Sequence, residues 1–124
     1  MAENESKTLL ASAARIADVT VEERNHRWRG ILISVDVTAI VATPLVRPRI
    51  QAKDDAGALY TIWSAAADIA ATGKFSYLIY PGITVAAFVG TEAANLPLPL
   101  VWALFMDHVD ADSITYSVKL DYLS

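Results

Sequence analysis

With no cysteine in its sequence, the chain cannot form a disulfide, a thiolate metal site or a cysteine nucleophile. Charged residues make up only 19% of the 124 residues, against 54% hydrophobic ones, which excludes disorder of the whole chain. The apolar stretch at residues 96–106 contains Pro97 and Pro99 and is shorter than the ~18 residues of a membrane-spanning helix. The opening MAENESK has no apolar core, so we expect no secretory signal and no membrane association.

Positive charge is also scarce, and the net charge is −4. Residues 1–62 carry eight basic and eight acidic side chains, whereas residues 63–124 carry two basic and six acidic ones. A chain without a basic stripe is a poor match for a phosphate backbone, so we expect no nucleic-acid partner. The local exception, at Arg24, Arg27 and Arg29, stands beside two glutamates and is interpreted as a solvated, self-paired loop.

The dominant pattern is alternation of side chains with a period of two, which is typical of half-buried β-strands. It is clearest at residues 31–38 and 113–122, and it predicts six inward-facing residues: Ile31, Ile33, Val35, Ile114, Tyr116 and Val118. Turn-forming residues separate further candidate strands at residues 7–12, 15–20, 45–53, 58–64, 74–80 and 98–109. About eight short strands predict an all-β fold, either an antiparallel β-sandwich or a jelly roll.

Helix is the competing interpretation at residues 65–71 and 86–95, where alanine is frequent. Both segments are short, so one short helix at either place fits the sequence, but an all-α fold does not. Pro44 and Pro48 each remove a ladder donor, which predicts that the strand at residues 45–53 lies at a sheet edge or carries a bulge. We expect one β-sandwich domain at residues 8–124, preceded by a flexible N-terminal arm at residues 1–7.

Residues 98–106 are apolar on both faces of the strand that they are predicted to form. Leu98 and Trp102 share one face, and Phe105 lies on the other. A sandwich strand normally shows one face to water, so either a loop of the same chain or a second subunit is expected to cover the outer face. We therefore predict a protein interface that includes these three residues, since large rings supply contact area.

No catalytic or metal-binding constellation stands out in the sequence. His108 lies near Asp107, Asp110 and Asp112, but alternation sends Asp107 and His108 to opposite faces of a strand, and the other two acids belong to the following turn. The chain has no G-x-S-x-G, H-E-x-x-H, G-x-G-x-x-G or P-loop motif. We expect no enzyme activity, no catalytic residue, no cofactor and no metal.

The three tryptophans raise the question of sugar binding, because exposed rings can stack on sugar rings. Trp63 and Trp102 fall in apolar strands, where packing is the ordinary role of a large ring. Trp28, between Arg27 and Arg29, is the one tryptophan that we expect to be accessible. We add Trp28, Arg27 and Arg29 to the predicted protein interface, and a carbohydrate platform at Trp28 is the alternative.

A wider pattern of strands and turns runs over roughly residues 7–119. Its segments are TLLASAAR at 8–15, SVDVTA at 34–39, ATP at 42–44, IQAKD at 50–54, YT at 60–61, AATG at 70–73, YPGIT at 80–84 and HVDADSITYSV at 108–118. With these segments the chain resembles a family of small virion proteins of tailed bacteriophages. The segments contain no catalytic signature. Residues 45–49 and 96–106 depart from the family pattern by being more apolar.

The resemblance implies a structural virion component, and its implied role is a capsid decoration (cement) protein that binds and stabilises the expanded head. The implied partners are the major capsid protein and neighbouring copies of the chain, which form a homo-oligomer on the particle. The protein would be made in the host bacterial cytoplasm and reside on the capsid surface of the virion. The acidic second half of the chain argues against a position beside packaged DNA.

Three alternatives stay open at this point. A head–tail connector, tail or baseplate protein would form a small ring, whereas a decoration protein occurs in many copies. A carbohydrate-binding module would present an accessible aromatic platform near Trp28. A hydrolase with a site assembled from distant strands ranks last.

Overall fold

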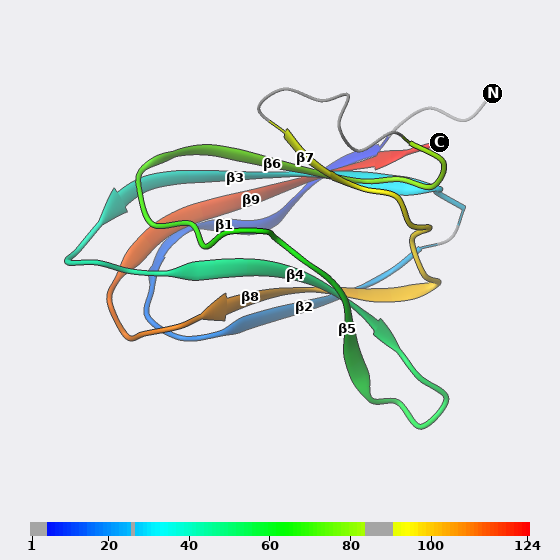
Figure 1. Cartoon of the computed structure of the whole chain (residues 1–124), viewed down its shortest axis with the longest axis horizontal. Helices are drawn as coiled ribbons and strands as arrows, with labels where there is room; N and C mark the ends of the chain where they lie inside the picture. Colours follow the sequence, from blue (N-terminus) through cyan, green and yellow to red (C-terminus); the bar gives the residue numbers. More distant parts are fainter. Residues whose placement is uncertain (1–4, 26, 84–90) are drawn as a thin grey trace.

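The computed structural model describes residues 5–25, 27–83 and 91–124, which form two β-sheets packed face to face (Figure 1). The five-stranded sheet has the order β1 (Glu5–Arg15), β9 (Ile114–Leu123), β3 (Gly30–Ile40), β6 (Gly73–Ile79) and β7 (Thr91–Ala94). The four-stranded sheet has the order β2 (Val19–Arg24), β8 (Val101–His108), β4 (Val46–Lys53) and β5 (Leu59–Ser64). The predicted all-β sandwich is confirmed.

The strand order is that of a jelly roll with one added strand. Without β7, the two sheets read β1-β9-β3-β6 and β2-β8-β4-β5, so most connections carry the chain from one sheet to the other. All pairs are antiparallel except β6 with β7, which run parallel. The added strand therefore extends one edge of the five-stranded sheet and leaves the jelly-roll order of the other eight unchanged.

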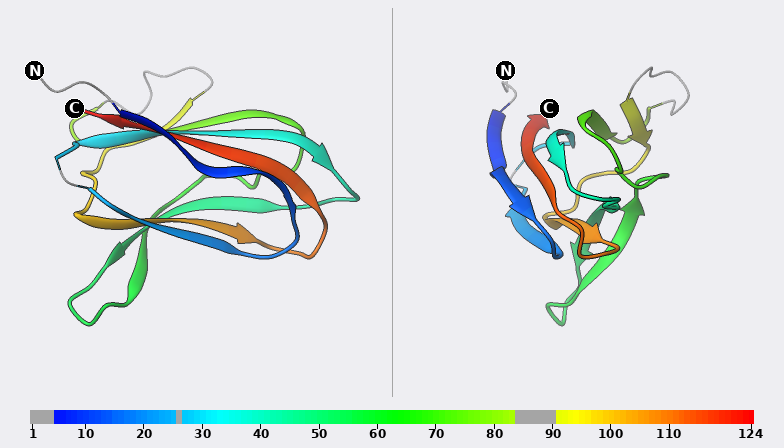
Figure 2. Two further views of the ribbon diagram at one scale, coloured as in Figure 1. Left: turned by 180° about the vertical axis from the view of Figure 1, so that it is seen from behind. Right: turned by 90° about the vertical axis from the view of Figure 1, so that its left-hand side faces the viewer.

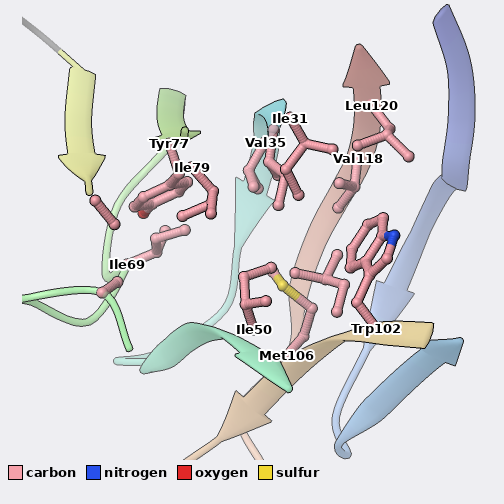
Figure 3. Close-up of a cluster of buried hydrophobic side chains, with 14 of the residues drawn as sticks. Ile31, Val35, Ile50, Ile69, Tyr77, Ile79, Trp102, Met106, Val118 and Leu120 are labelled. Atoms are coloured by element: carbon pink, nitrogen blue, oxygen red, sulfur yellow. The ribbon is translucent and has the colours of Figure 1, made fainter. Parts of the chain in front are cut away.

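The core lies between the sheets and follows the alternation seen in the sequence. All six predicted inward residues are buried, each with at most 1% of its surface exposed: Ile31, Ile33, Val35, Ile114, Tyr116 and Val118. From the opposite sheet, Ile50, Trp102 and Met106 pack toward them (Figure 3). The register of β3 is regular with β6, and with β9 it is regular from Gly30 to Val37 before a shift between Val37 and Ala39, so this part of the central strand keeps one face toward the core.

Several boundaries differ from the predicted ones. Residues 65–71 form no helix, because Ile69 instead makes a two-bond bridge to Val46 beside β4. Residues 91–95 of the second helix candidate are likewise not helical, since β7 occupies most of them, and residues 86–90 lie outside the described part. Strand β1 already begins at Glu5, so residues 5–7 of the predicted arm pair with β9, and residues 1–4 lie outside the described part. The strand predicted at residues 15–20 is split by a turn between β1 and β2.

Strand β4 is not at an edge, because it lies between β8 and β5, and it carries no bulge itself, so the prediction for this strand is wrong: the bulge is on the neighbouring strand β5. The register with β5 shifts between Ile50 and Gln51, where Ile62 is the extra residue. Pro48 is tolerated because it lies just before the residues of β4 that pair with β5. The side of β4 on which its N–H is missing faces Ala65, and the Ala65 N–H donates to the Pro48 carbonyl there at 2.9 Å.

The outer face of β8 is covered by charged side chains of its own sheet rather than by a loop. Lys53 of β4 reaches Glu22 of β2 at 2.9 Å, and this ion pair spans β8 at Ala103, which is fully buried. Arg49 pairs with Asp107 at 3.0 Å on the same face. The flexible stems of such side chains shield apolar surface while their charges stay hydrated. Within the described ranges, no helix is long and apolar enough to cross a membrane.

Val35→Asp tests the assignment of the two faces of β3. The substitution buries an unpaired carboxylate, so we expect the free energy of unfolding to fall by about 3 kcal/mol or more. Ser34→Asp, on the outer face of the same strand, is the matched control and is expected to change stability by less than about 1 kcal/mol. Urea denaturation measures both variants, and equal midpoints would contradict the assignment.

Candidate functional site

The structure corrects three of the six predicted interface residues. Trp102 has no exposed surface, and Leu98 and Trp28 are each only 7% exposed. Tyr122 lies between the two tryptophans: it stacks on Trp28 with ring centroids 6.1 Å apart and meets Trp102 edge-on at 6.3 Å. The apolar face that holds Trp102 is therefore the inner face of β8, and these rings close one end of the core rather than binding a partner.

The other three predicted interface residues are accessible but lie apart from one another. Phe105 is half-buried on the outer face of β8, beside Arg49. Arg27 and Arg29 are exposed, with guanidinium carbons 4.8 Å from the Trp28 ring centroid and 5.8 Å from that of Tyr80, respectively. The neighbouring glutamates pair with lysines instead, so the predicted self-pairing of this arginine loop is wrong. Trp28, buried and stacked, offers no open sugar platform.

An apolar groove, which sequence reasoning missed, opens at the end of the four-stranded sheet. It has a volume of about 480 Å³ and lies between the β4–β5 hairpin and residues 96–101, which we call the wall segment. Tyr60 and Leu100 stand at this groove with 51% and 58% of their surface exposed. The hairpin projects away from the rest of the sandwich (Figure 2). The lining residues are Ala52, Lys53, Tyr60, Ile62, Leu96, Pro97, Pro99, Leu100 and Val101.

A buried asparagine fixes the wall segment in place. The Asn25 N–H donates to the Leu100 carbonyl at 2.7 Å, and its side-chain amide donates to the Leu98 carbonyl at 3.3 Å and the Trp28 carbonyl at 2.7 Å. Its side-chain oxygen accepts the Trp28 N–H at 2.8 Å. Because these bonds hold the backbone on both sides of Pro99, Leu100 is kept exposed by a satisfied, buried network.

The opposite side of the groove is held by Trp63. Its ring meets Tyr77 of the five-stranded sheet edge-on, with ring centroids 5.6 Å apart. This contact ties one end of β5 to the sandwich, while the turn at residues 54–58 leaves the other end projecting. Burial, followed by the nearby charge of Glu92, raises the pKa of Tyr77 to about 12, so its hydroxyl stays protonated at neutral pH. Both sides of the groove are thus anchored to the core.

A second polar cluster lies at the far end of the sandwich. His108 Nε2 is 2.9 Å from the Tyr116 hydroxyl. The backbone N–H of His108 donates to the Asp18 carboxylate at 2.7 Å. The guanidinium of Arg15 lies 4.5 Å from the Tyr116 ring centroid and donates to the Tyr116 carbonyl at 2.5 Å. Asp107 faces outward to Arg49, so the predicted separation of Asp107 and His108 is confirmed.

Burial dominates the electrostatics of this cluster. It lowers the pKa of His108 despite the opposing charge of Asp18, and His108 Nδ1 is buried with no hydrogen-bond partner among the described residues. Burial also raises the pKa of Tyr116 to about 12. Asp112 accepts the Thr43 N–H at 3.2 Å and holds a turn, as predicted. Among the described residues, no three His, Asp or Glu side chains are placed to share a metal ion.

Asn25→Ala tests whether this side chain holds the wall segment. The change leaves the buried Trp28 N–H and carbonyl groups unpaired, so we expect a loss of about 2 kcal/mol of unfolding free energy in urea. Asn95→Ala is the control, because Asn95 is exposed and accepts a single bond from the Gly82 N–H. Its cost is expected to be below about 1 kcal/mol, and equal losses would contradict the assigned role.

The pH dependence of stability tests the environment of His108. Because folding lowers its pKa, the unfolded chain takes up the proton first as pH falls below the ordinary value of 6.5. We therefore expect full stability above that pH and a progressive loss below it, measured as urea midpoints. His108→Gln is expected to flatten this slope relative to the wild type. An unchanged slope in His108→Gln would contradict the assignment.

Comparison of the sequence with models of known protein families and with curated proteins finds no match.

Proposed function

We propose that this chain is a structural component of a tailed-phage virion, a capsid decoration protein that binds the outside of the expanded head. It acts by contact alone and has no catalytic role. The wall segment is its contact with the major capsid protein, and it replaces the interface around Trp102 that the sequence had predicted. Bound copies then stabilise the shell by bridging its neighbouring subunits.

The observation that carries this proposal is the rigid exposure of the wall segment. Leu100 is 58% exposed although Asn25 fixes the backbone on which it stands. Pro97 and Pro99 restrict the same segment further. An apolar surface that is already ordered loses little conformational entropy on binding, which favours a protein contact over a flexible solvent-facing loop.

The resemblance to phage virion proteins is the second support. Its segments include turns that hold the fold together: Asp112 in HVDADSITYSV accepts the N–H of Thr43 in ATP, and Gly82 in YPGIT donates to Asn95 at 2.6 Å. Gly82 has a φ of 80°, a conformation that favours glycine. These residues act as framework, which suits a family defined by its architecture rather than by a catalytic site.

The jelly-roll strand order agrees with this role without deciding it. Viral structural proteins use this architecture repeatedly, but so do lectins and cupins. The lectin-like alternative loses its main support because Trp28 is buried. A connector, tail or baseplate role predicts the same kind of contact surface and differs in copy number and position, which particles can reveal.

Add-back to capsids tests the proposed function. Expanded shells made without this protein are incubated with purified wild-type protein, and bound copies are counted by quantitative mass spectrometry. We expect saturable binding in numbers set by the capsid symmetry, because each equivalent position on the shell offers the same contact. Leu100→Glu places a charge on the wall segment and is expected to abolish most of this binding.

Val109→Glu is the matched control, because Val109 is equally exposed, at 59%, and lies outside the groove. It is expected to bind like the wild type. Saturation at a single ring on the tail vertex would contradict the decoration role and favour a connector. Equal binding of both glutamate variants would contradict the assignment of the wall segment.

A further inference from the structure

The two sheets have four edge strands, and β5 differs from the other three. Strands β1, β2 and β7 each carry at least one charged residue, for example Lys7, Glu22 and Glu92. Strand β5, with the sequence LYTIWS, carries none and contains no proline. Charged side chains and prolines are two of the devices by which proteins protect sheet edges from pairing with other chains; a bulge is a third, and β5 has one at Ile62. Strand β5 lacks the first two.

The outer edge of β5 is also open. Within the described residues, its backbone has hydrogen-bond partners only on the side of β4. The bulge at Ile62 bends the strand, and the hairpin stands clear of the sandwich (Figure 1). The open backbone groups therefore lie where a second strand can approach without meeting the rest of the molecule.

We propose that β5 pairs with β5 of a second copy of this chain, antiparallel and about a two-fold axis. The two four-stranded sheets then become one continuous eight-stranded sheet. The backbone groups at each edge find partners in the other copy, and the exposed Tyr60 side chains of both copies are brought to the same junction. Such an interface is self-complementary, as two-fold dimers require.

Charge favours a second copy in this antiparallel arrangement. Asp54 and Asp55 form an acidic tip at the Leu59 end of the hairpin, and the other end of β5 lies near Arg47 and Arg49. Antiparallel pairing sends the two acidic tips to opposite ends of the junction, where each meets the partner's arginines, which Asp68 and Asp107 of that copy already neutralise, instead of a second acidic tip. Parallel pairing would gather four carboxylates at one end of chains that each carry a net charge of −4.

The strand pairing is independent of the virion role, because it involves only copies of this chain. It also leaves the wall segment free for a different contact. A decoration protein needs two contacts to bridge a shell, and the structure offers two that differ in chemistry: an apolar wall and an uncharged strand edge. The experiment below needs no capsid, so its failure and the failure of the proposed function are distinguishable.

Sedimentation equilibrium of the purified full chain tests the dimer. We expect a reversible dimer for the wild type, and loss of the dimer in Tyr60→Lys and Thr61→Lys, because lysine on an edge strand blocks pairing. Both residues are exposed, so the variants are expected to keep the melting temperature that the wild type shows at concentrations where it is monomeric. Val109→Lys, at the far end of the molecule, and Leu100→Glu, on the wall segment, are expected to remain dimers.

Cysteine scanning locates the junction, since the natural chain has no cysteine. Single cysteines at residues 59–64 are oxidised, and we expect disulfide-linked dimers to peak at one position within β5, where the two-fold axis brings identical residues together. Ile16→Cys, equally exposed elsewhere, is expected to stay unlinked. A monomer at the highest soluble concentration, or a dimer that both lysine variants of β5 leave intact, would overturn the proposal.

Discussion

The structure depends on the packing of the inward faces of β3 and β9 against β4 and β8. Ile33, Val118 and Leu104 have almost no exposed surface, and removing such side chains from water is the main favourable contribution to folding. Because side chains alternate along a strand, this single requirement fixes the register of the central strands. It also sends the outer faces to solvent, where pairs such as Lys53 with Glu22 cover the apolar residues left there.

The candidate binding surface arises where this packing ends. Strand β5 is held to the sandwich at Trp63 and projects from it on the Leu59 side, and the wall segment crosses from β7 to β8 at the same end of the molecule. A crossing segment exposes backbone polar groups that must find partners, and the buried Asn25 supplies them. The same bonds hold Leu100 outward. The hydrogen bonds of Asn25 thus pair the buried backbone groups of the wall segment and also hold an apolar surface in place beside the uncharged edge of β5.

The sequence alone predicted the strands of strict alternation, because burial on one face determines them almost completely. It missed β7, because the four residues TEAA show no alternation. It also predicted Trp102 at an interface, because both faces of β8 are apolar and only tertiary packing decides which of them is the inner one. The groove was also missed, since hairpin and wall segment are distant in sequence. One signal was available: β5 is the edge strand without a charge, but identifying edges requires the topology.

The most direct test of the proposed role is a cryo-electron microscopy map of tailed-phage particles assembled in the presence of this protein. We expect the sandwich on the outside of the head, with residues 96–101 against the major capsid protein and the β5 strands of two copies side by side across a two-fold axis. A map that shows the protein as one ring at the tail vertex, or on the head with Leu100 and β5 both facing solvent, would contradict this expectation.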